Sequence, residues 1–150
     1  MRVISTDQGE ISQTPCGLGQ ISRQARDDSE WYTFSMSKQV IAVDIDDVLF
    51  PFVPEFVQFD NARFNGSLSE DDFFNYRFWE VLGIPLDEAV ERVYDFNAAE
   101  HSHIEPLYNV KDSLKALSKD YDLVVITARH PRFADVTDNW LNTHLEGIFS

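Results

Sequence analysis

Residues 40–47 read Val-Ile-Ala-Val-Asp-Ile-Asp-Asp, and this stretch decides the fold class of the 150-residue chain. Its first half is a short apolar run rich in β-branched side chains, which is typical of a strand buried in a parallel sheet. Its second half places three carboxylates within four residues. The pattern predicts a buried strand near residues 39–45 whose carboxyl end carries an acidic cluster.

A second apolar run, Leu-Val-Val-Ile at residues 123–126, predicts another buried strand near residues 122–127. Residues 148–150, Ile-Phe-Ser, resemble the start of a third strand. Parallel strands joined by helices make an α/β fold with a Rossmann-like sheet. Two or three strands with one helix each leave much of a sheet uncovered, so we expect the sheet to be incomplete at its C-terminal end.

Helices are predicted from apolar spacing and from start signals. The expected helices begin near Pro54 and near Ser69, follow Pro85, span residues 110–118, and run from Phe133 to Leu145 with Gly147 as the C-cap.

The first 35 residues differ in composition from the rest. They are rich in Gly, Pro, Ser, Gln and Thr and show no sustained period, so we predict a disordered N-terminal segment over 1–35. Met36 leads directly into the first predicted strand. We therefore expect one domain over residues 36–150, and we hypothesise that translation starts at Met36.

The net charge and the cysteine content limit the classes of molecule that this protein is expected to bind and the compartment in which it is expected to work. Twenty-six acidic residues against twelve basic ones give a net charge of −14, which repels nucleic-acid polymers and anionic membranes. A phosphorylated substrate is repelled too, so a phosphate site needs a metal or clustered donors. The single cysteine, Cys16, excludes an intrachain disulfide, and no stretch approaches the ~20 apolar residues of a membrane helix. A cytoplasmic protein with a small substrate is expected.

The acidic cluster has the composition of a catalytic metal site. Ligands bind outside the carboxyl ends of strands in open α/β sheets, and oxygen ligands suit Mg²⁺. Asp44 and Asp46 project to the same side if the strand geometry continues, so one carboxylate can attack a phosphorus atom while the other donates a proton. Solvated loop acids remain the plain alternative. A calcium loop is excluded because Val48 and Leu49 stand where an oxygen ligand and a glycine are required.

The second strand ends in a candidate phosphate site. Thr127, Ala128 and Arg129 offer a hydroxyl, main-chain N–H groups and a guanidinium before a following helix. Adjacent parallel strands would bring Asp44 and Thr127 to the same edge. The expected ligand is therefore a phosphate group.

These two motifs resemble those of the haloacid dehalogenase superfamily. The stretch Ile41 to Leu49 is similar to its first motif, and Val125 to Arg129 is similar to its second. The closest likeness is to the 5′(3′)-deoxyribonucleotidases and related 5′-nucleotidase-like proteins. It covers residues 38–150 and is supported by Phe52, Arg77-Phe78-Trp79, Ile104-Glu105-Pro106-Leu107, Trp140-Leu141, His144 and Gly147-Ile148-Phe149.

The resemblance implies a mechanism and a set of residues. It implies that Asp44 forms an aspartyl-phosphate, that Asp46 acts as general acid and then base, and that Thr127 binds the phosphoryl group. Mg²⁺ would bind the Asp44 carboxylate and the Asp46 main-chain carbonyl. The implied reaction is hydrolysis of phosphate monoesters, with nucleoside 5′-monophosphates as the leading substrates.

The same resemblance implies a small helical cap over residues 52–106. Aromatic side chains of this cap would hold the base of a nucleotide, and the candidates are Phe52, Phe78 and Trp79. Stacking on a base contributes about 1–3 kcal/mol per contact. The alternative for each of the three is a role in the apolar core of the cap.

Two departures from the superfamily pattern have consequences. Asp47 stands where many relatives have glycine, which adds charge beside the nucleophile. A later motif with Lys or Arg and another with Asp are also implied, and the printed sequence ends at Ser150 before either. We therefore expect the chain to stop short of the complete site. The alternatives are a phosphatase acting on another small phosphoester, or a truncated, non-catalytic protein that binds phosphate or a partner.

His101 and His103, flanked by Glu100 and Glu105, could be read as metal ligands. Alternating residues on a loop rarely complete a tetrahedral site, and no cysteine lies near. We therefore assign them no metal. The sequence does not specify the oligomeric state.

Overall fold

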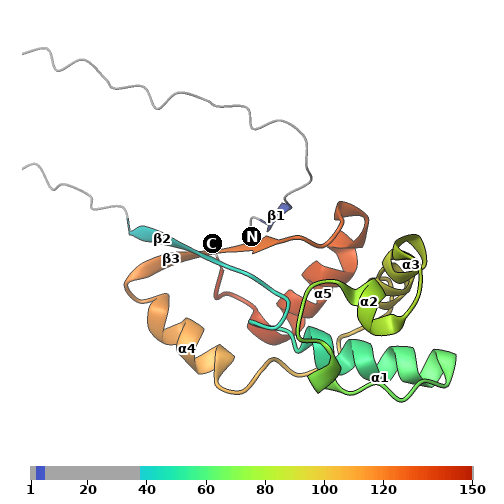
Figure 1. Ribbon diagram of the computed structural model, residues 1–150. Coiled ribbons are helices and arrows are strands. Elements are labelled where there is room, and N and C mark those ends of the chain that lie inside the picture. The colour runs from blue at the N-terminus through green and yellow to red at the C-terminus, as the bar shows by residue number, and fades with distance from the viewer. Residues whose placement is uncertain (1–2, 6–37, 150) are drawn as a thin grey trace, which may run out of the picture.

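The structure is a computed structural model that describes residues 3–5 and 38–149 (Figure 1). Its elements follow in the order β1 (Val3–Ser5), β2 (Gln39–Val43), α1 (Phe52–Phe64), η1 (Glu70–Asp72), α2 (Phe78–Leu82), α3 (Leu86–Asn97), α4 (Val110–Leu117), β3 (Tyr121–Thr127), η2 (Pro131–Phe133) and α5 (Ala134–Leu145).

The described strands form one small parallel sheet. Their order is β1-β3-β2, so β3 is the central strand. Gln39–Val43 of β2 pairs with Tyr121–Val125 of β3. Because Val43 lies opposite Val125 in a parallel pair, the chain leaves both strands at the same edge of the sheet. The register therefore brings the segment that starts at Asp44, after β2, close to Arg129, which follows β3.

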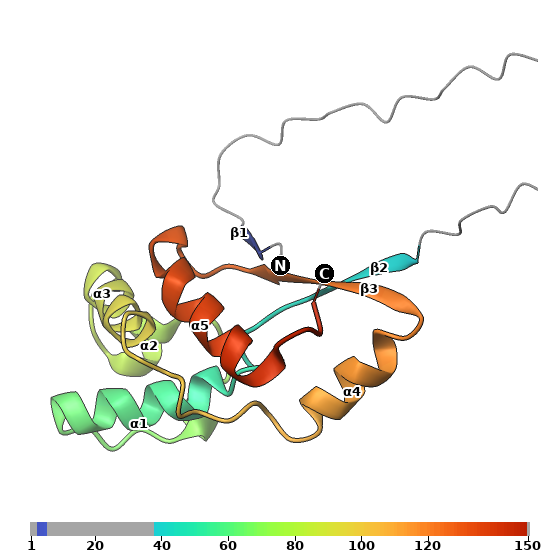
Figure 2. The ribbon, with the colours of Figure 1, turned by 180° about the vertical axis from the view of Figure 1, so that it is seen from behind.

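Helices lie on one face of the sheet and beyond one edge. Both ribbon views show α4 and α5 under the sheet, while α1, α2 and α3 form a group beyond the carboxyl ends of β2 and β3 (Figures 1 and 2). Leu123, Val125 and Thr127 are buried and alternate with half-buried residues along β3. This alternation is expected for a strand whose one face packs on helices. In the part of the chain that the structure describes, no helix is long and apolar enough to cross a membrane.

Aromatic side chains join the sheet to the helices. Phe50 is fully buried, and its ring lies 5.2 Å from that of Trp140 of α5 in an edge-to-face arrangement. Such pairs contribute about 0.5–1.5 kcal/mol beyond their buried area. The Trp140 indole N–H donates a hydrogen bond of 2.8 Å to the carbonyl of Ile104. The segment that follows α3 is thereby anchored to α5.

The helical group has its own buried contacts. Asp60 of α1 is 2% exposed and is paired with Arg92 of α3 at 3.3 Å. The Arg92 guanidinium also lies over the ring of Phe64 at 3.6 Å from its centre. Asn65 ends α1 in the left-handed conformation, with φ of 53°, as asparagine often does at this position. These contacts hold α1 against α3.

Ser69 begins a single 3-10 turn, η1, rather than the α-helix that its acidic neighbours suggest. Its side chain and that of Asp72 form a capping box, with the Ser69 N–H donating to the Asp72 carboxylate at 2.8 Å. The backbone bonds of Phe73 return to Glu70, and the chain then turns away. The capping residues therefore do start a helical segment at Ser69, but it is a single 3-10 turn and not the expected α-helix.

The N-terminal segment holds one element that the sequence does not predict. Residues 3–5, inside the segment 1–35 expected to be disordered, form β1 and pair with Val125–Thr127. A three-residue strand is too short to show a period of two, so no pattern reveals it. Residues 1–2 and 6–37, and with them Cys16 and the Met36 start, lie outside the described residues.

The third strand expected at residues 148–150 is not formed by its described part. Ile148 lies in a turn, where its N–H donates to the Leu145 carbonyl at 3.3 Å. Gly147 precedes it with φ of 74°, which redirects the chain at the end of α5. Among the described residues, β3 pairs with β1 and β2, and residues 148 and 149 form no strand. Ser150 lies outside the described residues.

Candidate active site

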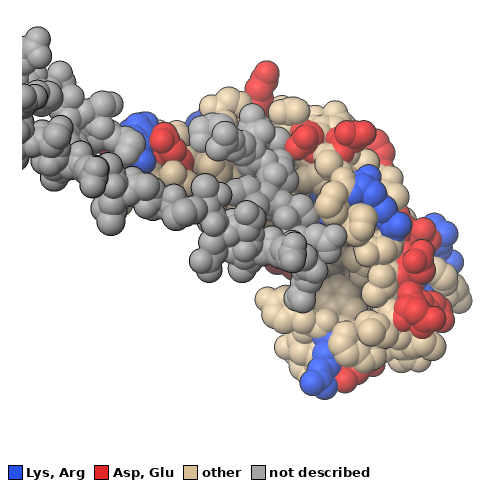
Figure 3. Space-filling model, turned by 90° about the horizontal axis from the view of Figure 1, so that it is seen from above, with Lys and Arg blue, Asp and Glu red and all other residues tan. Residues whose placement is uncertain are grey.

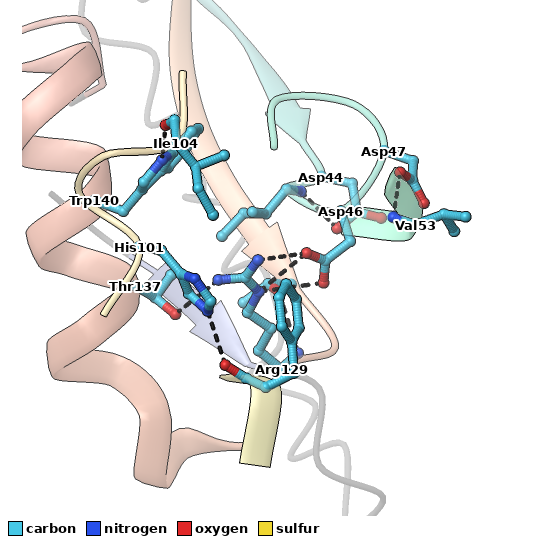
Figure 4. Close-up of polar contacts among 12 residues, drawn as sticks. Asp44, Asp46, Asp47, Val53, His101, Ile104, Arg129, Thr137 and Trp140 are labelled. Carbon is cyan, nitrogen blue, oxygen red and sulfur yellow. Dashed lines mark hydrogen bonds and ion pairs between the residues drawn. The ribbon is translucent and has the colours of Figure 1, made fainter. Parts of the chain in front are cut away.

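The acidic cluster forms a tight turn directly after β2. The Ile45 carbonyl accepts hydrogen bonds from Leu49 and Phe50 at 2.8 and 2.9 Å, and the Asp47 N–H donates to the Phe50 carbonyl at 2.8 Å. Asp44 is exposed at the sheet edge, where its Oδ1 accepts a 2.8 Å bond from the N–H of Ile45. The turn presents the three aspartates on one loop (Figure 4).

Asp47 has a structural task in this turn. Its φ of 56° lies in the left-handed region, which glycine adopts freely and aspartate tolerates. Its Oδ1 accepts a 3.0 Å hydrogen bond from the N–H of Val53 in the first turn of α1. Pro51, at the N-cap of that helix, makes no side-chain cap. Asp47 therefore supplies the cap from outside the helix, which explains how a residue other than glycine is stabilised in this left-handed conformation.

Arg129 connects the end of β3 to this turn. Its Nη2 lies 2.6 Å from Asp46 Oδ1, and its Nε lies 3.0 Å from the same oxygen and 3.3 Å from Oδ2 (Figure 4). The guanidinium is 4.8 Å from the ring centre of Phe50. Its side chain is 3% exposed, whereas that of Asp46 is 28% exposed. The pair is thus buried on the arginine side and open on the carboxylate side.

Thr127 and Arg129 also interact through the main chain. Thr127 Oγ1 accepts a hydrogen bond of 3.1 Å from the Arg129 N–H, and Thr127 is 5% exposed. Arg129 Nη1 reaches Thr137 Oγ1 of α5 at 3.5 Å. These contacts fix the direction in which the chain leaves β3, and so fix the guanidinium against Asp46.

The protonation of Asp46 follows from these surroundings. Burial raises the pKa of Asp46 above its ordinary value, and the charges of Asp44 and Asp47 add to the rise. The ion pair and hydrogen bonds with Arg129 act in the opposite direction and lower the pKa by less. The outcome is a carboxylate that holds a proton more readily than a solvated aspartate does.

Two cavities meet at this edge of the sheet. The cap cavity, of about 360 Å³, is lined by Asp46, Phe52, Tyr76, Phe78, Trp79, Leu86, Ala89, Val90, Val93, Tyr94, Asn97, Ala128 and Arg129. The edge cavity, of about 470 Å³, is lined by Asp44, Asp46, Asp47, Phe52, Val53, Phe73, Phe74, Asn75, Tyr76, Phe78 and Ala128. Both volumes lie in the range of small-molecule sites. The space-filling view from above shows a hollow on this face, bordered by uncharged side chains (Figure 3).

The structure brings most of the residues chosen from the sequence to these cavities. Asp46, Phe52, Phe78 and Ala128 line both, and Asp44 lines the edge cavity. Trp79 and Arg129 line the cap cavity. Thr127 differs because it is buried behind them, with its hydroxyl engaged by the Arg129 N–H.

The aromatic candidates belong to a core as well as to a cavity. Phe52 is 7% exposed and stacks on Phe56, with ring centres 5.9 Å apart. Phe78 lies 4.8 Å from Phe73 and 5.6 Å from Phe56. The core alternative and the binding hypothesis therefore coexist for these two rings: one side of each is packed, and the cavity lies on another.

Among the further residues that line the cap cavity, three carry polar groups and were not singled out as site residues in the sequence. Tyr76 is 98% exposed, Tyr94 lies against Phe133 at 5.5 Å, and Asn97 is 5% exposed. Tyr76 and Tyr94 are aromatic residues of the segment 52–106, as Phe78 and Trp79 are, so the sequence offered the same reason to choose them. Asn97 carries no signal, because an asparagine at the end of a helical pattern is ordinarily a capping residue.

The donor set fits a hard cation at the sheet edge. No group of three His, Cys, Asp or Glu side chains that could hold a metal exists among the described residues. Mg²⁺, however, is held in proteins by one or two carboxylates, and waters and substrate phosphates complete its shell. The exposed Asp44 carboxylate beside the edge cavity suits that role, whereas Arg129 already occupies the Asp46 carboxylate.

His101 is buried in the core and hydrogen-bonded to the main chain. It is 3% exposed, and its Nε2 lies 2.8 Å from the Phe96 carbonyl, to which it donates. Its ring packs on Phe96 and Phe50 at 4.7 and 5.3 Å. Burial lowers the pKa of His101, so the neutral ring is favoured. His103 is exposed and lies 3.8 Å from Glu100.

Comparison with known proteins agrees with this geometry. Residues 38–150 match the family described as "5' nucleotidase, deoxy (Pyrimidine), cytosolic type C protein". The chain belongs to this family. The match takes in β2, the helical group, β3 and α5, and so includes both motifs at the sheet edge.

One curated relative is similar to a large part of this chain. It is a Bacillus subtilis (strain 168) protein named "Putative nucleotidase YqfW", 28% identical over 111 residues. The alignment covers 72% of this chain and 57% of that protein. The chain thus matches little more than half the length of the relative.

Proposed function

We propose that this chain carries the nucleophile and the general acid of a Mg²⁺-dependent hydrolase of phosphate monoesters, with nucleoside 5′-monophosphates as substrates. The observation that carries the proposal is the meeting of two strand ends. Asp44 and Asp46 follow β2, Ala128 and Arg129 follow the paired strand β3, and all four line adjoining cavities. The family match to a 5′ nucleotidase supports the reaction class.

In this proposal Asp44 attacks the phosphorus atom. Its carboxylate is exposed beside the edge cavity, so a phosphate group can approach it. The attack displaces the alcohol and leaves an aspartyl-phosphate, which water then hydrolyses. The main-chain N–H groups near Ala128 would hold the phosphoryl oxygens. The Thr127 hydroxyl accepts the Arg129 N–H behind the cavity wall, so it would contact the phosphoryl group only by turning its own hydrogen toward it. Mg²⁺, when bound, would neutralise charge between the Asp44 carboxylate and the phosphate.

Asp46 would give its proton to the leaving oxygen and take one from the attacking water. Its raised pKa is the direction that a general acid requires near neutral pH. Arg129 would orient the carboxylate, because its Nη2 donates to Oδ1 and its Nε to Oδ2, and a bidentate pair fixes the plane of both groups. One edge of Asp46 remains open to the cavities.

The helical group α1–α3 would act as the cap that selects the substrate. It lies beyond the carboxyl ends of the strands, and its aromatic residues line the cap cavity (Figure 1). Phe52, Phe78 and Trp79 would stack on the base, which contributes about 1–3 kcal/mol per contact. A Rossmann-like haloacid dehalogenase fold and a cytoplasmic location are parts of the same proposal.

The proposal is tested by phosphate release from a panel of nucleoside monophosphates and sugar phosphates, with and without Mg²⁺. We expect nucleoside 5′-monophosphates to be hydrolysed fastest and Asp44→Asn to abolish turnover. The matched control is Asp71→Asn, because Asp71 is exposed in η1 and lines neither cavity. Faster hydrolysis of sugar phosphates would indicate another phosphoester. Phosphate binding without turnover in the parent would favour a non-catalytic protein.

A further inference from the structure

Asn97, the last residue of α3, is a buried polar residue whose side-chain oxygen has no hydrogen-bond partner among the described residues. It is 5% exposed, and its Oδ1 is fully buried and accepts no hydrogen bond from the described residues. Buried amide groups in native proteins are nearly always paired, and an unpaired one lowers stability. Its presence therefore calls for an explanation outside packing.

Helix capping does not supply that explanation. α3 ends at Asn97, but the C-cap is Ala98, which is right-handed and whose N–H bonds to the Tyr94 and Phe96 carbonyls. A capping asparagine would stand outside the helix in the left-handed conformation, as Asn65 does after α1. Asn97 has neither the position nor the conformation of a cap.

Asn97 lines the cap cavity, where its amide could contact a bound ligand. Asn97 is the only carboxamide among the residues that line this cavity, and most of the remaining wall is aromatic or aliphatic. The two charged lining residues, Asp46 and Arg129, are bound to each other. A pocket of this kind holds a flat apolar ligand by its walls and sets its orientation by a few polar groups.

We infer that Asn97 is a specificity-determining residue that hydrogen-bonds the polar edge of a nucleobase bound in the cap cavity. A carboxamide presents a donor and an acceptor side by side in one plane, and rotation by 180° about Cβ–Cγ exchanges them without changing shape. Nucleobase edges present donors and acceptors in the same adjacent, coplanar way. The aromatic wall would hold the faces of the base while Asn97 reads its edge. The inference rests on the proposed function, because it takes the substrate to be a nucleotide.

The test compares two phosphate monoesters that differ in one property. Uridine 5′-monophosphate has an aromatic ring with a hydrogen-bonding edge, and phenyl phosphate has a ring without one. Calorimetric Kd values are measured with Mg²⁺ on a parent that carries Asp44→Asn, so that the ligands are not turned over, and on the same protein with Asn97→Leu, Asn97→Ala or the exposed control Asn142→Leu. We expect Asn97→Leu to weaken nucleotide binding about tenfold, the effect of one lost hydrogen bond in a dry site, and to leave phenyl phosphate unchanged.

Stability is the second readout. Leucine has a similar size and removes the unpaired group, so we expect the Tm of Asn97→Leu to equal or exceed that of the parent. An equal loss for both ligands, or a lower Tm with unchanged discrimination, would mean that Asn97 only supports the fold and would overturn the inference. Asn97→Ala removes the amide without filling space, so it decides the case if the leucine variant does not fold.

The outcomes separate the two proposals. Tight nucleotide binding by the parent that Asn97→Leu and Asn97→Ala both retain would overturn the role of Asn97 and leave the proposed function standing. Equal parent affinity for the nucleotide and for phenyl phosphate would overturn the base contact and the nucleotide substrate, while phosphate recognition would stand. No binding of either ligand would overturn both proposals.

Discussion

Two arginine–carboxylate pairs, one in the helical group and one at the sheet edge, differ in which partner is buried. In the helical group, Arg92 and Asp60 have side chains 15% and 3% exposed and lie 3.3 Å apart. At the sheet edge, Arg129 and Asp46 have side chains 3% and 28% exposed and lie 2.6 Å apart. In the first pair, called the cap pair, the carboxylate is the more buried partner. In the second, called the site pair, the arginine is the more buried partner. A carboxylate left open beside a cavity can take part in chemistry, whereas a hidden one can only hold helices together.

The largest effect is expected from breaking the cap pair. Asp60→Ala leaves Arg92 largely buried without its buried partner, so we expect the free energy of unfolding to fall by about 3–5 kcal/mol. Urea unfolding measures it. The matched control is Glu88→Ala, which removes the exposed partner of the same arginine and is expected to cost less than about 1 kcal/mol. Equal losses would show that burial does not distinguish the two carboxylates.

Breaking the site pair is expected to cost less stability and more activity. Asp46→Asn keeps one acceptor for Arg129 and lies where water can enter, so we expect a loss of about 1–3 kcal/mol. Turnover should fall about 10²–10⁴-fold if Asp46 transfers the proton. Urea unfolding and phosphate release are measured on the same preparation. Unchanged turnover would contradict the assignment of Asp46, and a larger loss of stability than for Asp60→Ala would contradict the comparison.

His101 contacts both regions, through Phe50 near the site and Phe96 of α3. The pH dependence of the free energy of unfolding tests this buried residue. Its folded pKa is lowered by burial, so the unfolded chain binds a proton more tightly. Stability is therefore complete above about pH 6.5, the unfolded value, and declines as pH falls below it. We expect this decline, measured by urea unfolding at pH 7.5 and 5.5, to shrink in His101→Gln. His103→Gln, at an exposed position, should behave as the parent; the reverse order would refute the argument.

The smallest effect is expected at Asp47. Asp47→Asn keeps both the left-handed preference and an acceptor for the Val53 N–H, so stability should change by less than about 0.5 kcal/mol. Removing its charge should lower the pKa of Asp46, because Asp47 raises it. Carbon-13 NMR of the Asp46 carboxyl group measures this shift. A pKa that rises or stays fixed would show that the two carboxylates do not interact.

Local patterns in the sequence predict much of this arrangement. The β-branched runs before Asp44 and Thr127 predict β2 and β3, and parallel pairing then implies that their carboxyl ends share an edge. The start near Pro54 fits α1, whereas the C-cap of α5 is Glu146 and the predicted Gly147 follows it by one residue in the left-handed conformation. These features depend on residues close together in the chain.

The remainder depends on partners far apart in the chain. Arg129 and Asp46 are separated by 83 positions, and only the register of β2 on β3 brings them within 2.6 Å. Asn97 is buried at the end of α3, which no helical period reveals. The short strand β1 gains its pairing from β3 and has no pattern of its own. Tertiary packing selects these contacts among many that the sequence permits.

A crystal structure of the protein grown with Mg²⁺ and beryllium fluoride, which mimics a phosphoryl group on aspartate, tests the central claim most directly. The account predicts the beryllium bound to the Asp44 carboxylate, with its fluorines facing the Ala128 main chain and Mg²⁺ beside it. Beryllium bound to Asp46 or another carboxylate, with Asp44 free, would contradict it.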